Sequence, residues 1–383
     1  MSWISWLKFA LSGIATAMVI SGCKSLTEGT VSQDSSSVLE TTAADTHPRD
    51  MTGYLWGLDS IEKLMTKSRK ESSDGFGQLL LVSMEKQMHQ IPANIPYDLT
   101  QAEKVELTIR LECPRGGTCE AWDRLGTLML VHNYPPKNEV PIEIIRFMTP
   151  YGEGATWTVD VTEYAAILSG KYTIRTYIQS WSRLSDKLPT GWAMTLGLRV
   201  TGTNPSKLRP RVVHPMFTFA SIPYGDPTQT AVRYASNIPG LKNVYKKAVL
   251  KTLITGHGQS NLDNCAEFCN KKHTIKIGSQ AYFPLVWRDD CARTVSSTQQ
   301  GNYQSSRAGW CPGDYVRAQS FDITKALDKP FHQGSYFPEQ YVNTCRPNQV
   351  PCKGCENDVT CAYDDHLHTP PSWLVTANII LYR

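Results

Sequence analysis

The segment 117–125 reads GTCEAWDRL and places one acidic residue, Asp123, between an indole and a guanidinium. These neighbours are Trp122 and Arg124, and the group follows closely after Cys119. In a cleft, the arginine could orient the carboxylate while the aromatic ring offers a surface for a sugar. In a solvated loop the same group would mean little, so the prediction of a sugar site requires the rest of the chain to supply a cleft.

A second acidic residue, Glu267, lies in the stretch TGHGQSNLDNCAEFCNKKHT (255–274), between Cys265 and Cys269. If these two cysteines form a disulfide, the carboxylate is held on a rigid knuckle, as a group that transfers protons requires. A third stretch, SSRAGWCPGD (305–314), adds a cation, a second indole and another cysteine. Each stretch alone has a simpler explanation, because paired cysteines with nearby charges often only staple loops.

The composition excludes some functions. The chain has 383 residues, enough for two domains of ordinary size with separate cores. Charged residues make up 19% of it, its net charge is only +4, and it has no dense run of lysine and arginine. This pattern argues against a nucleic-acid-binding protein.

The N-terminal segment MSWISWLKFALSGIATAMVISGC predicts export. Its apolar run from Phe9 to Gly22 is short for a membrane span and is typical of a signal peptide, which we assign to residues 1–23. The ending ISGC is similar to a bacterial lipoprotein processing site, so we expect lipidation of Cys23; an ordinary cleaved signal is the alternative. Residues 24–50 are rich in Ser, Thr and acids and predict a disordered tether. We therefore expect a monomeric lipoprotein at the outer membrane, in the periplasm or on the cell surface.

The cysteines fit an oxidising compartment. Of the eleven cysteines, those other than Cys23 form an even set suited to disulfides. Two close pairs stand out, Cys113 with Cys119 and Cys265 with Cys269. The remaining cysteines are Cys291, Cys311, Cys345, Cys352, Cys355 and Cys361. The last four could instead form a zinc site, but export favours disulfides.

The rest of the chain is predicted to be mostly strands. VELTIRLEC (105–113) alternates apolar and polar residues with a strict period of two, and WTVDVT, YTIRTYIQSW and the C-terminal WLVTANIILYR have the composition and patterning of strands. Only residues 54–70 offer a plausible short helix. The sequence predicts an all-β protein of the sandwich or jelly-roll class. The polar stretch 201–211 is a candidate boundary between domains at 52–203 and 207–383.

In order along the chain, the motifs ECP…TC…WDR, RFMTPYG, SGKYTIRTYIQSW, NCAEFCNKKHTI and RAGWCPG resemble the signature stretches of the peptide-N-glycosidase F family. The resemblance runs from about residue 54 to the C-terminus and includes the late pair Cys291 and Cys311. It implies two antiparallel eight-stranded jelly rolls packed side by side, with the glycan in the cleft between them. It also implies an exported amidase that removes N-linked glycans from asparagine and uses no cofactor or metal.

The resemblance also implies roles for single residues. Asp123 matches the principal catalytic aspartate of the family, and Glu267 matches its essential glutamate. The residues on positions that line the cleft are Trp122, Arg124, Trp181, Arg307 and Trp310. One carboxylate would activate water, and an arginine or the second acid would polarise the carbonyl or protonate the departing amine. The products would be an aspartate and a glycosylamine.

Gln179 departs from the family pattern, which has an acidic residue two positions before the tryptophan of this strand. Glutamine cannot exchange protons, although it can hydrogen-bond a sugar hydroxyl. A glycan-binding lipoprotein without the usual activity is therefore an alternative. A copper monooxygenase of the same architecture is a further alternative, because His366 and His368 have a spacing that copper can use. His257 and His273 are interpreted as hydrogen-bonded structural histidines.

Overall fold

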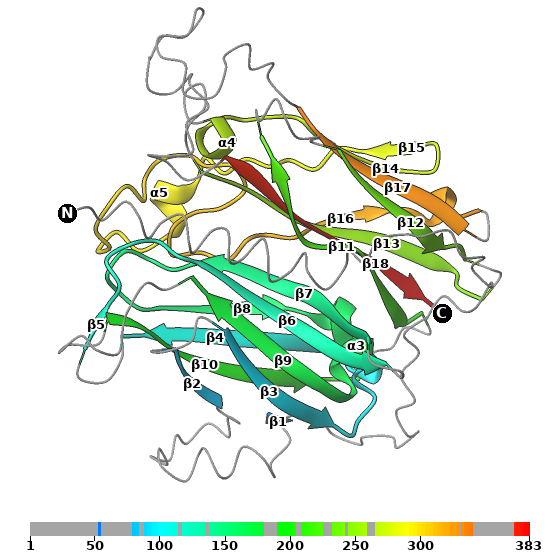
Figure 1. Cartoon of the computed structure of the whole chain (residues 1–383). Helices are drawn as coiled ribbons and strands as arrows, with labels where there is room; N and C mark the ends of the chain where they lie inside the picture. The colour runs from blue at the N-terminus through cyan, green and yellow to red at the C-terminus, as the bar shows by residue number, and fades with distance from the viewer. Residues whose placement is uncertain are drawn as a thin grey trace, which may run out of the picture.

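The computed structural model contains two β-sandwiches that pack against each other (Figure 1). The structure describes residues 53–54, 79–83, 88–113, 117–134, 138–179, 190–203, 208–224, 232–241, 244–258, 265–328, 331–339 and 371–383. The expected all-β class is confirmed, since strands dominate these residues. The signal peptide, the tether, Cys23 and nearly all of the expected helix at 54–70 lie outside them, and Tyr54 belongs to a short strand.

The first sandwich is built from two sheets. One sheet has the order β1-β10-β4-β8, with β2 and β5 also paired to β10, and the other has the order β3-β9-β6-β7. The strands are β1 (Gly53–Tyr54), β2 (Leu79–Ser83), β3 (Met88–Ile95), β4 (Lys104–Glu112), β5 (Thr118–Cys119), β6 (Leu125–Tyr134), β7 (Asn138–Met148), β8 (Ala155–Asp160), β9 (Gly170–Ile178) and β10 (Thr190–Thr201). The pairing departs from the antiparallel expectation at one place, because the two residues of β5 run parallel to β10.

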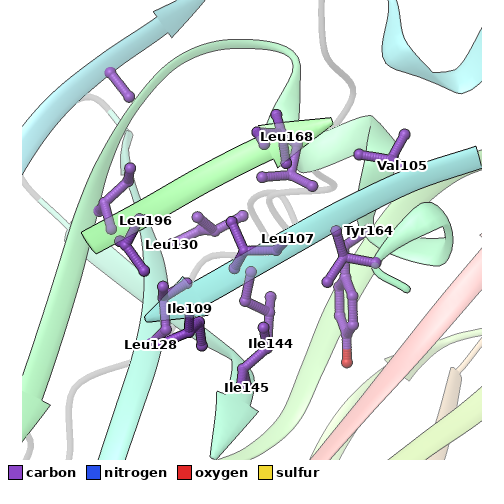
Figure 2. Close-up of a cluster of buried hydrophobic side chains, with 14 of the residues drawn as sticks. Val105, Leu107, Ile109, Leu128, Leu130, Ile144, Ile145, Tyr164, Leu168 and Leu196 are labelled. Carbon is purple, nitrogen blue, oxygen red and sulfur yellow. The ribbon is translucent and has the colours of Figure 1, made fainter. Parts of the chain in front are cut away.

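Strand β4 shows why the sequence folds in this way. Val105, Leu107, Ile109 and Leu111 each retain 1% or less of their exposure and point into the core. Figure 2 shows three of them among apolar side chains that include those of Leu128, Leu130, Ile144 and Ile145, from the opposite sheet. Burial of one such side chain contributes roughly 1.5–3 kcal/mol, so the predicted period of two is fixed by the core.

The second sandwich also consists of two sheets, with the orders β11-β18-β13-β16 and β12-β17-β14-β15. Its strands are β11 (Pro210–Pro223), β12 (Arg233–Pro239), β13 (Lys247–His257), β14 (His273–Ile277), β15 (Gln280–Tyr282), β16 (Gln319–Asp322), β17 (Phe331–Pro338) and β18 (Ser372–Tyr382). All their pairings are antiparallel. The proposed boundary stretch separates β10 from β11, although its residues 204–207 lie outside the described part.

Strand β18 is buried on both faces, and this explains why its sequence is apolar almost throughout. One face, with Trp373 and Ile379, packs into the core of the second sandwich. On the other face, Ile380 belongs to the core of the first sandwich. The sheet that contains β18 is therefore the layer on which the two halves meet.

Backbone hydrogen bonds also cross between the halves. The segment 313–316 runs along β7, where the Met148 amide donates to the Asp314 carbonyl at 3.0 Å and the Val316 amide donates to the Arg146 carbonyl at 2.7 Å. Helices are short: α3 (Ala165–Leu168), α4 (Cys265–Phe268) and α5 (Cys291–Thr294). Among the described residues, none forms a helix long and apolar enough to cross a membrane.

Candidate functional site

The loop that carries Asp123 is clamped between two strand ends. Asp123 lies two residues before β6, and Thr149 lies directly after β7, the neighbouring strand. The Arg124 amide donates to the Thr149 hydroxyl at 2.8 Å, and the Thr149 amide donates back to the Arg124 carbonyl at 2.9 Å. The disulfide between Cys113 and Cys119 fixes the entry to the loop. These contacts leave the acidic residue little backbone freedom.

Glu267 lies on α4 in the second sandwich, where Cys265 and Cys269 form the expected disulfide. The Glu267 carbonyl accepts from the Ala308 amide at 2.8 Å, and its carboxylate accepts from the backbone of Gly258. A glycine is required at position 256, because a Cβ there would lie 1.8 Å from the backbone oxygen of Ala266. The knuckle is therefore held tightly against the end of β13.

Arg307 joins the knuckle to its surroundings. Its side chain is 1% exposed, and its Nη1 donates to Glu267 Oε1 at 2.9 Å. Its Nη2 donates to the Asn302 carbonyl at 2.5 Å. The guanidinium carbon lies 4.8 Å from the ring centre of Phe268 and 4.6 Å from that of Trp310. Charge pairing and two aromatic faces thus hold the cation in one place.

Tyr151 completes a bridge between the two acidic residues. Its hydroxyl donates to the Asp123 carboxylate and lies 3.5 Å from Arg307 Nη2, at the long limit of a hydrogen bond. The ring packs against the backbone of Gly301, which has φ +80° and where a Cβ would lie 2.8 Å from the ring. The series Glu267, Arg307, Tyr151 and Asp123 therefore connects one carboxyl from each sandwich.

The electrostatics of the two carboxyls differ. Burial raises the pKa of Asp123, while attraction by Arg307 and the hydrogen bond from Tyr151 oppose the rise. Burial raises the pKa of Glu267 to about 7, an effect that outweighs the attraction of Arg307 and to which the charge of Asp123 adds. Burial also raises the pKa of the Tyr151 hydroxyl, so this group stays protonated and donates. Two carboxyls with separate environments are suited to divide the roles of base and acid.

The other predicted site residues on the first sandwich lie around Asp123. Trp122 is 61% exposed, and its ring meets that of Tyr151 edge to face at 6.3 Å, so one face remains available to a ligand. Arg124 forms an ion pair with Glu120, with 2.5 Å between Nε and Oε1. The Gln179 amide donates to the Leu125 carbonyl at 3.0 Å, which places this half-buried residue beside the start of β6.

Trp310 requires a correction. It was predicted to line the cleft, but it is 2% exposed, its indole donates to the Gly256 carbonyl at 2.8 Å, and Arg307 covers it. A ring buried in this way supports the arginine and offers no face to a sugar. Trp181, the remaining predicted aromatic, lies outside the described residues.

The histidines and the other cysteines are also placed. His257 hydrogen-bonds Thr255 at 2.7 Å and His273 hydrogen-bonds Tyr336 at 2.6 Å, which confirms their interpretation as structural. The expected pair Cys291 and Cys311 forms a disulfide. Cys345, Cys352, Cys355, Cys361, His366 and His368 lie outside the described residues. Within the described part of the chain, no three His, Cys, Asp or Glu residues form a group that could hold a metal ion.

Comparison with known proteins shows what the chain is similar to. Residues 227–355 match the family model described as Peptide-N-glycosidase F, C terminal. Over 350 residues and 88% of each chain, the sequence is 25% identical to peptide-N(4)-(N-acetyl-beta-D-glucosaminyl)asparagine amidase F of Elizabethkingia miricola. The chain is a relative of peptide-N-glycosidase F.

Solved structures agree on the fold. The structure of peptide-N-glycosidase F described as a glycosylasparaginase from Flavobacterium meningosepticum superposes with a TM-score of 0.60 at 22% identity, covering 80% of this chain and 96% of that chain. The structure of PNGF-II superposes with a TM-score of 0.56 at 15% identity, covering 84% of this chain and 66% of that chain. At these sequence identities, the solved structures support only the β-sandwich architecture.

Sequence reasoning missed the residues that connect the acids. Tyr151 lies within the motif RFMTPYG, which contributes to the resemblance to peptide-N-glycosidase F, but no role was assigned to this tyrosine. Asn302 and Thr149 act through backbone or hydroxyl contacts that have no sequence signature. The motif, which also contains Thr149, was the available signal for Tyr151 and Thr149, and no pattern pointed to Asn302.

Proposed function

We propose that the chain is an amidohydrolase that cleaves the amide between asparagine and N-acetylglucosamine in N-glycosylated proteins or peptides. The observation that carries the proposal is the bridge Glu267, Arg307, Tyr151 and Asp123, which links a carboxyl from each sandwich. An amide is a poor electrophile with a poor leaving group, so its hydrolysis needs a base and an acid held on the same substrate. The relationship to peptide-N-glycosidase F supports the same reaction.

In the proposed reaction, Asp123 is the base. It removes a proton from a water molecule whose oxygen attacks the carbonyl carbon of the asparagine side chain. Arg307 and the Tyr151 hydroxyl are buried donors that act on this carboxylate, and they stabilise negative charge that develops on the carbonyl oxygen. The carbon–nitrogen bond then breaks.

Glu267 is the proposed acid. With a pKa of about 7, it holds a proton in a substantial fraction of molecules at neutral pH. It delivers this proton to the departing nitrogen, which leaves as a glycosylamine while the peptide retains an aspartate. Trp122 offers an exposed ring on which the first sugar stacks, and Gln179 is a proposed partner for a sugar hydroxyl.

The test is incubation of the purified protein with an N-glycosylated peptide, followed by mass spectrometry. We expect a peptide with aspartate in place of the glycosylated asparagine, together with the glycosylamine, which water converts to free glycan and ammonia. Asp123→Asn should lower kcat by ~10²–10⁴, the usual effect of removing a positioned base. Activity that survives either Asp123→Asn or Glu267→Gln undiminished would refute the assignment.

The same assay addresses the alternatives. Binding of the glycopeptide without turnover, with turnover gained by Gln179→Glu, would identify a glycan-binding protein instead. Activity that is lost with a chelator and regained with copper would favour the oxidoreductase.

We also propose that the mature chain is an exported monomer anchored through a lipid on Cys23. The proposal is supported by the apolar segment that ends in ISGC and by three disulfides in the described residues. Cys23→Ser should release the protein from the membrane fraction. Retention of the variant in that fraction would contradict the anchor, and sedimentation of the soluble form as a dimer would contradict the monomer.

A further inference from the structure

A fully buried ion pair lies where the two sandwiches meet. Glu143 and Arg146, both on β7, have side chains with 0% exposure and form two hydrogen bonds of 2.8 and 2.7 Å. The other contacts of the guanidinium go to the second sandwich. Nη1 donates to the Thr255 hydroxyl at 2.8 Å and to the Leu374 carbonyl at 2.7 Å, and Nη2 donates to the Thr376 hydroxyl at 3.3 Å.

Stability alone is a poor explanation for this pair. Burying two charges requires their dehydration, and well-packed apolar side chains often replace such a pair without loss of stability. A guanidinium donates hydrogen bonds in fixed directions, and apolar side chains cannot impose such directional contacts. Arg146 thus sets one particular placement of β13 relative to β7.

The hydrogen-bond directions lead from Arg146 towards the site. Arginine has only donors, so the Thr255 hydroxyl accepts from it and can direct its own proton to His257 Nε2, 2.7 Å away. Burial and the charges of Arg146 and Arg307 lower the pKa of His257 to about 3, so the imidazole is neutral and its Nε2 can accept. This contact assigns the ring proton to Nδ1.

The next contacts are aromatic. The His257 ring stacks on Trp310, with 5.4 Å between ring centres and 20° between planes. The guanidinium of Arg307 lies 4.6 Å from the centre of the same indole and pairs with Glu267. An unbroken series of buried and half-buried contacts therefore runs from Arg146, at the interface between the halves, to the arginine between the two carboxyls.

We propose that Arg146 is a positioning residue for Arg307, acting through Thr255, His257 and Trp310. The inference rests on the proposed amidase function, because it assigns the interface pair a role in that reaction. Without the Thr255 hydroxyl, the His257 ring loses the hydrogen bond that fixes its tautomer and orientation. The Trp310 ring, which stacks on His257 and supports Arg307, is then held less firmly. A displacement of about 1 Å in a catalytic group lowers the rate by ~10²-fold.

The sharpest variant is Thr255→Val, which keeps the shape of the side chain and leaves Glu143 and Arg146 paired. It removes the hydroxyl that accepts from Arg146 and contacts His257. The matched control is Lys251→Met. Lys251 lies on the same strand and also forms an ion pair across the interface, with Glu163, but it has no contact in the series above. A second variant, Glu143→Leu with Arg146→Met, replaces the buried pair with apolar side chains. It leaves no unpaired charge in the interior, so the chain is expected to fold.

We expect Thr255→Val and the double variant to lower kcat for the glycopeptide by ~10²-fold with KM nearly unchanged. Lys251→Met should keep wild-type kcat. Melting temperatures measured in parallel identify variants that lose activity by unfolding. Wild-type kcat in folded Thr255→Val, or an equal loss in Lys251→Met, would overturn the proposal.

A readout without turnover separates this proposal from the proposed function. The titration of the Glu267 carboxyl can be followed by carbon-13 NMR, using Glu267→Gln to assign the signal. We expect Thr255→Val to shift this titration because Arg307 moves relative to the carboxylate, and Lys251→Met to leave it in place. An inactive wild-type protein in which Thr255→Val shifts the titration would refute the amidase and retain the positioning role. An unshifted titration would refute the positioning role whatever the activity.

Discussion

Glu267 should make the stability of the folded chain depend on pH in a direction opposite to that of an ordinary paired carboxylate. Its side chain is 15% exposed, so solvent screens its environment only weakly. Its pKa is about 7 in the folded chain against 4.5 for the free side chain. At about 1.4 kcal/mol per pH unit, this difference corresponds to about 3 kcal/mol.

The sign follows from proton binding. Between pH 4.5 and about 7 the folded chain holds the Glu267 proton more tightly than the unfolded chain does. The contribution of this group to the free energy of unfolding is therefore fully present below pH 4.5, falls as the pH rises and is lost above about 7. Glu267→Gln removes this dependence, because glutamine does not titrate.

The assay is urea denaturation of wild type and Glu267→Gln at several pH values from 4 to 8, with the disulfides intact. Exchange of the neutral carboxyl for an amide changes the stability of the variant by an amount that is the same at each pH, because neither group is charged. Relative to wild type, the variant should gain about 3 kcal/mol between the two ends of the range. Parallel stability curves would refute the raised pKa, and with it the role of Glu267 as an acid at neutral pH.

Three further substitutions follow from the contacts. Tyr151→Phe removes the hydrogen bond that lowers the pKa of Asp123, so the acidic limb of the pH profile of kcat/KM should move to higher pH; an unmoved limb would contradict that contact. Arg146→Met alone leaves Glu143 charged and buried, and the free energy of unfolding should fall by about 3–5 kcal/mol, most of which the paired replacement should restore. Gly256→Ala introduces a Cβ 1.8 Å from a backbone oxygen of the knuckle, so thermal denaturation should show a loss of at least about 1–3 kcal/mol, and an unchanged melting temperature would disprove the close approach.

The sequence predicted those strands in which residues alternate between a buried and an exposed face. In β4, alternation reflects one buried face and one exposed face, so the strand could be identified from VELTIRLEC. In β18 both faces are buried, and its central apolar run does not tell which half covers which face. The adjacent sheets of the two sandwiches could be assigned only from the structure, because contacts such as that of Ile380 join residues far apart in the chain.

In the candidate site, too, local sequence predicted some residues, while contacts between distant parts of the chain decided others. The roles predicted for Asp123 and Glu267 came from the resemblance to peptide-N-glycosidase F, because an acidic residue beside paired cysteines often belongs to a stapled loop. Trp310 was misassigned because an indole beside an arginine has the same sequence pattern whether it faces solvent or supports the cation from below. Tyr151 was missed because its partners, Asp123 and Arg307, come from two different halves of the chain.

Gln179 gains a physical meaning from this arrangement. Its backbone is hydrogen-bonded to Leu125, two residues beyond Asp123, so a carboxylate at this position would add a negative charge near the Asp123 loop. Like charges raise one another's pKa, and a higher pKa would make Asp123 a carboxylate in fewer molecules at mildly acidic pH. A neutral glutamine avoids that repulsion while it keeps an amide for hydrogen bonding. The departure from the family pattern is therefore compatible with turnover, and it shifts the expected activity towards lower pH than a chain with three acids would show.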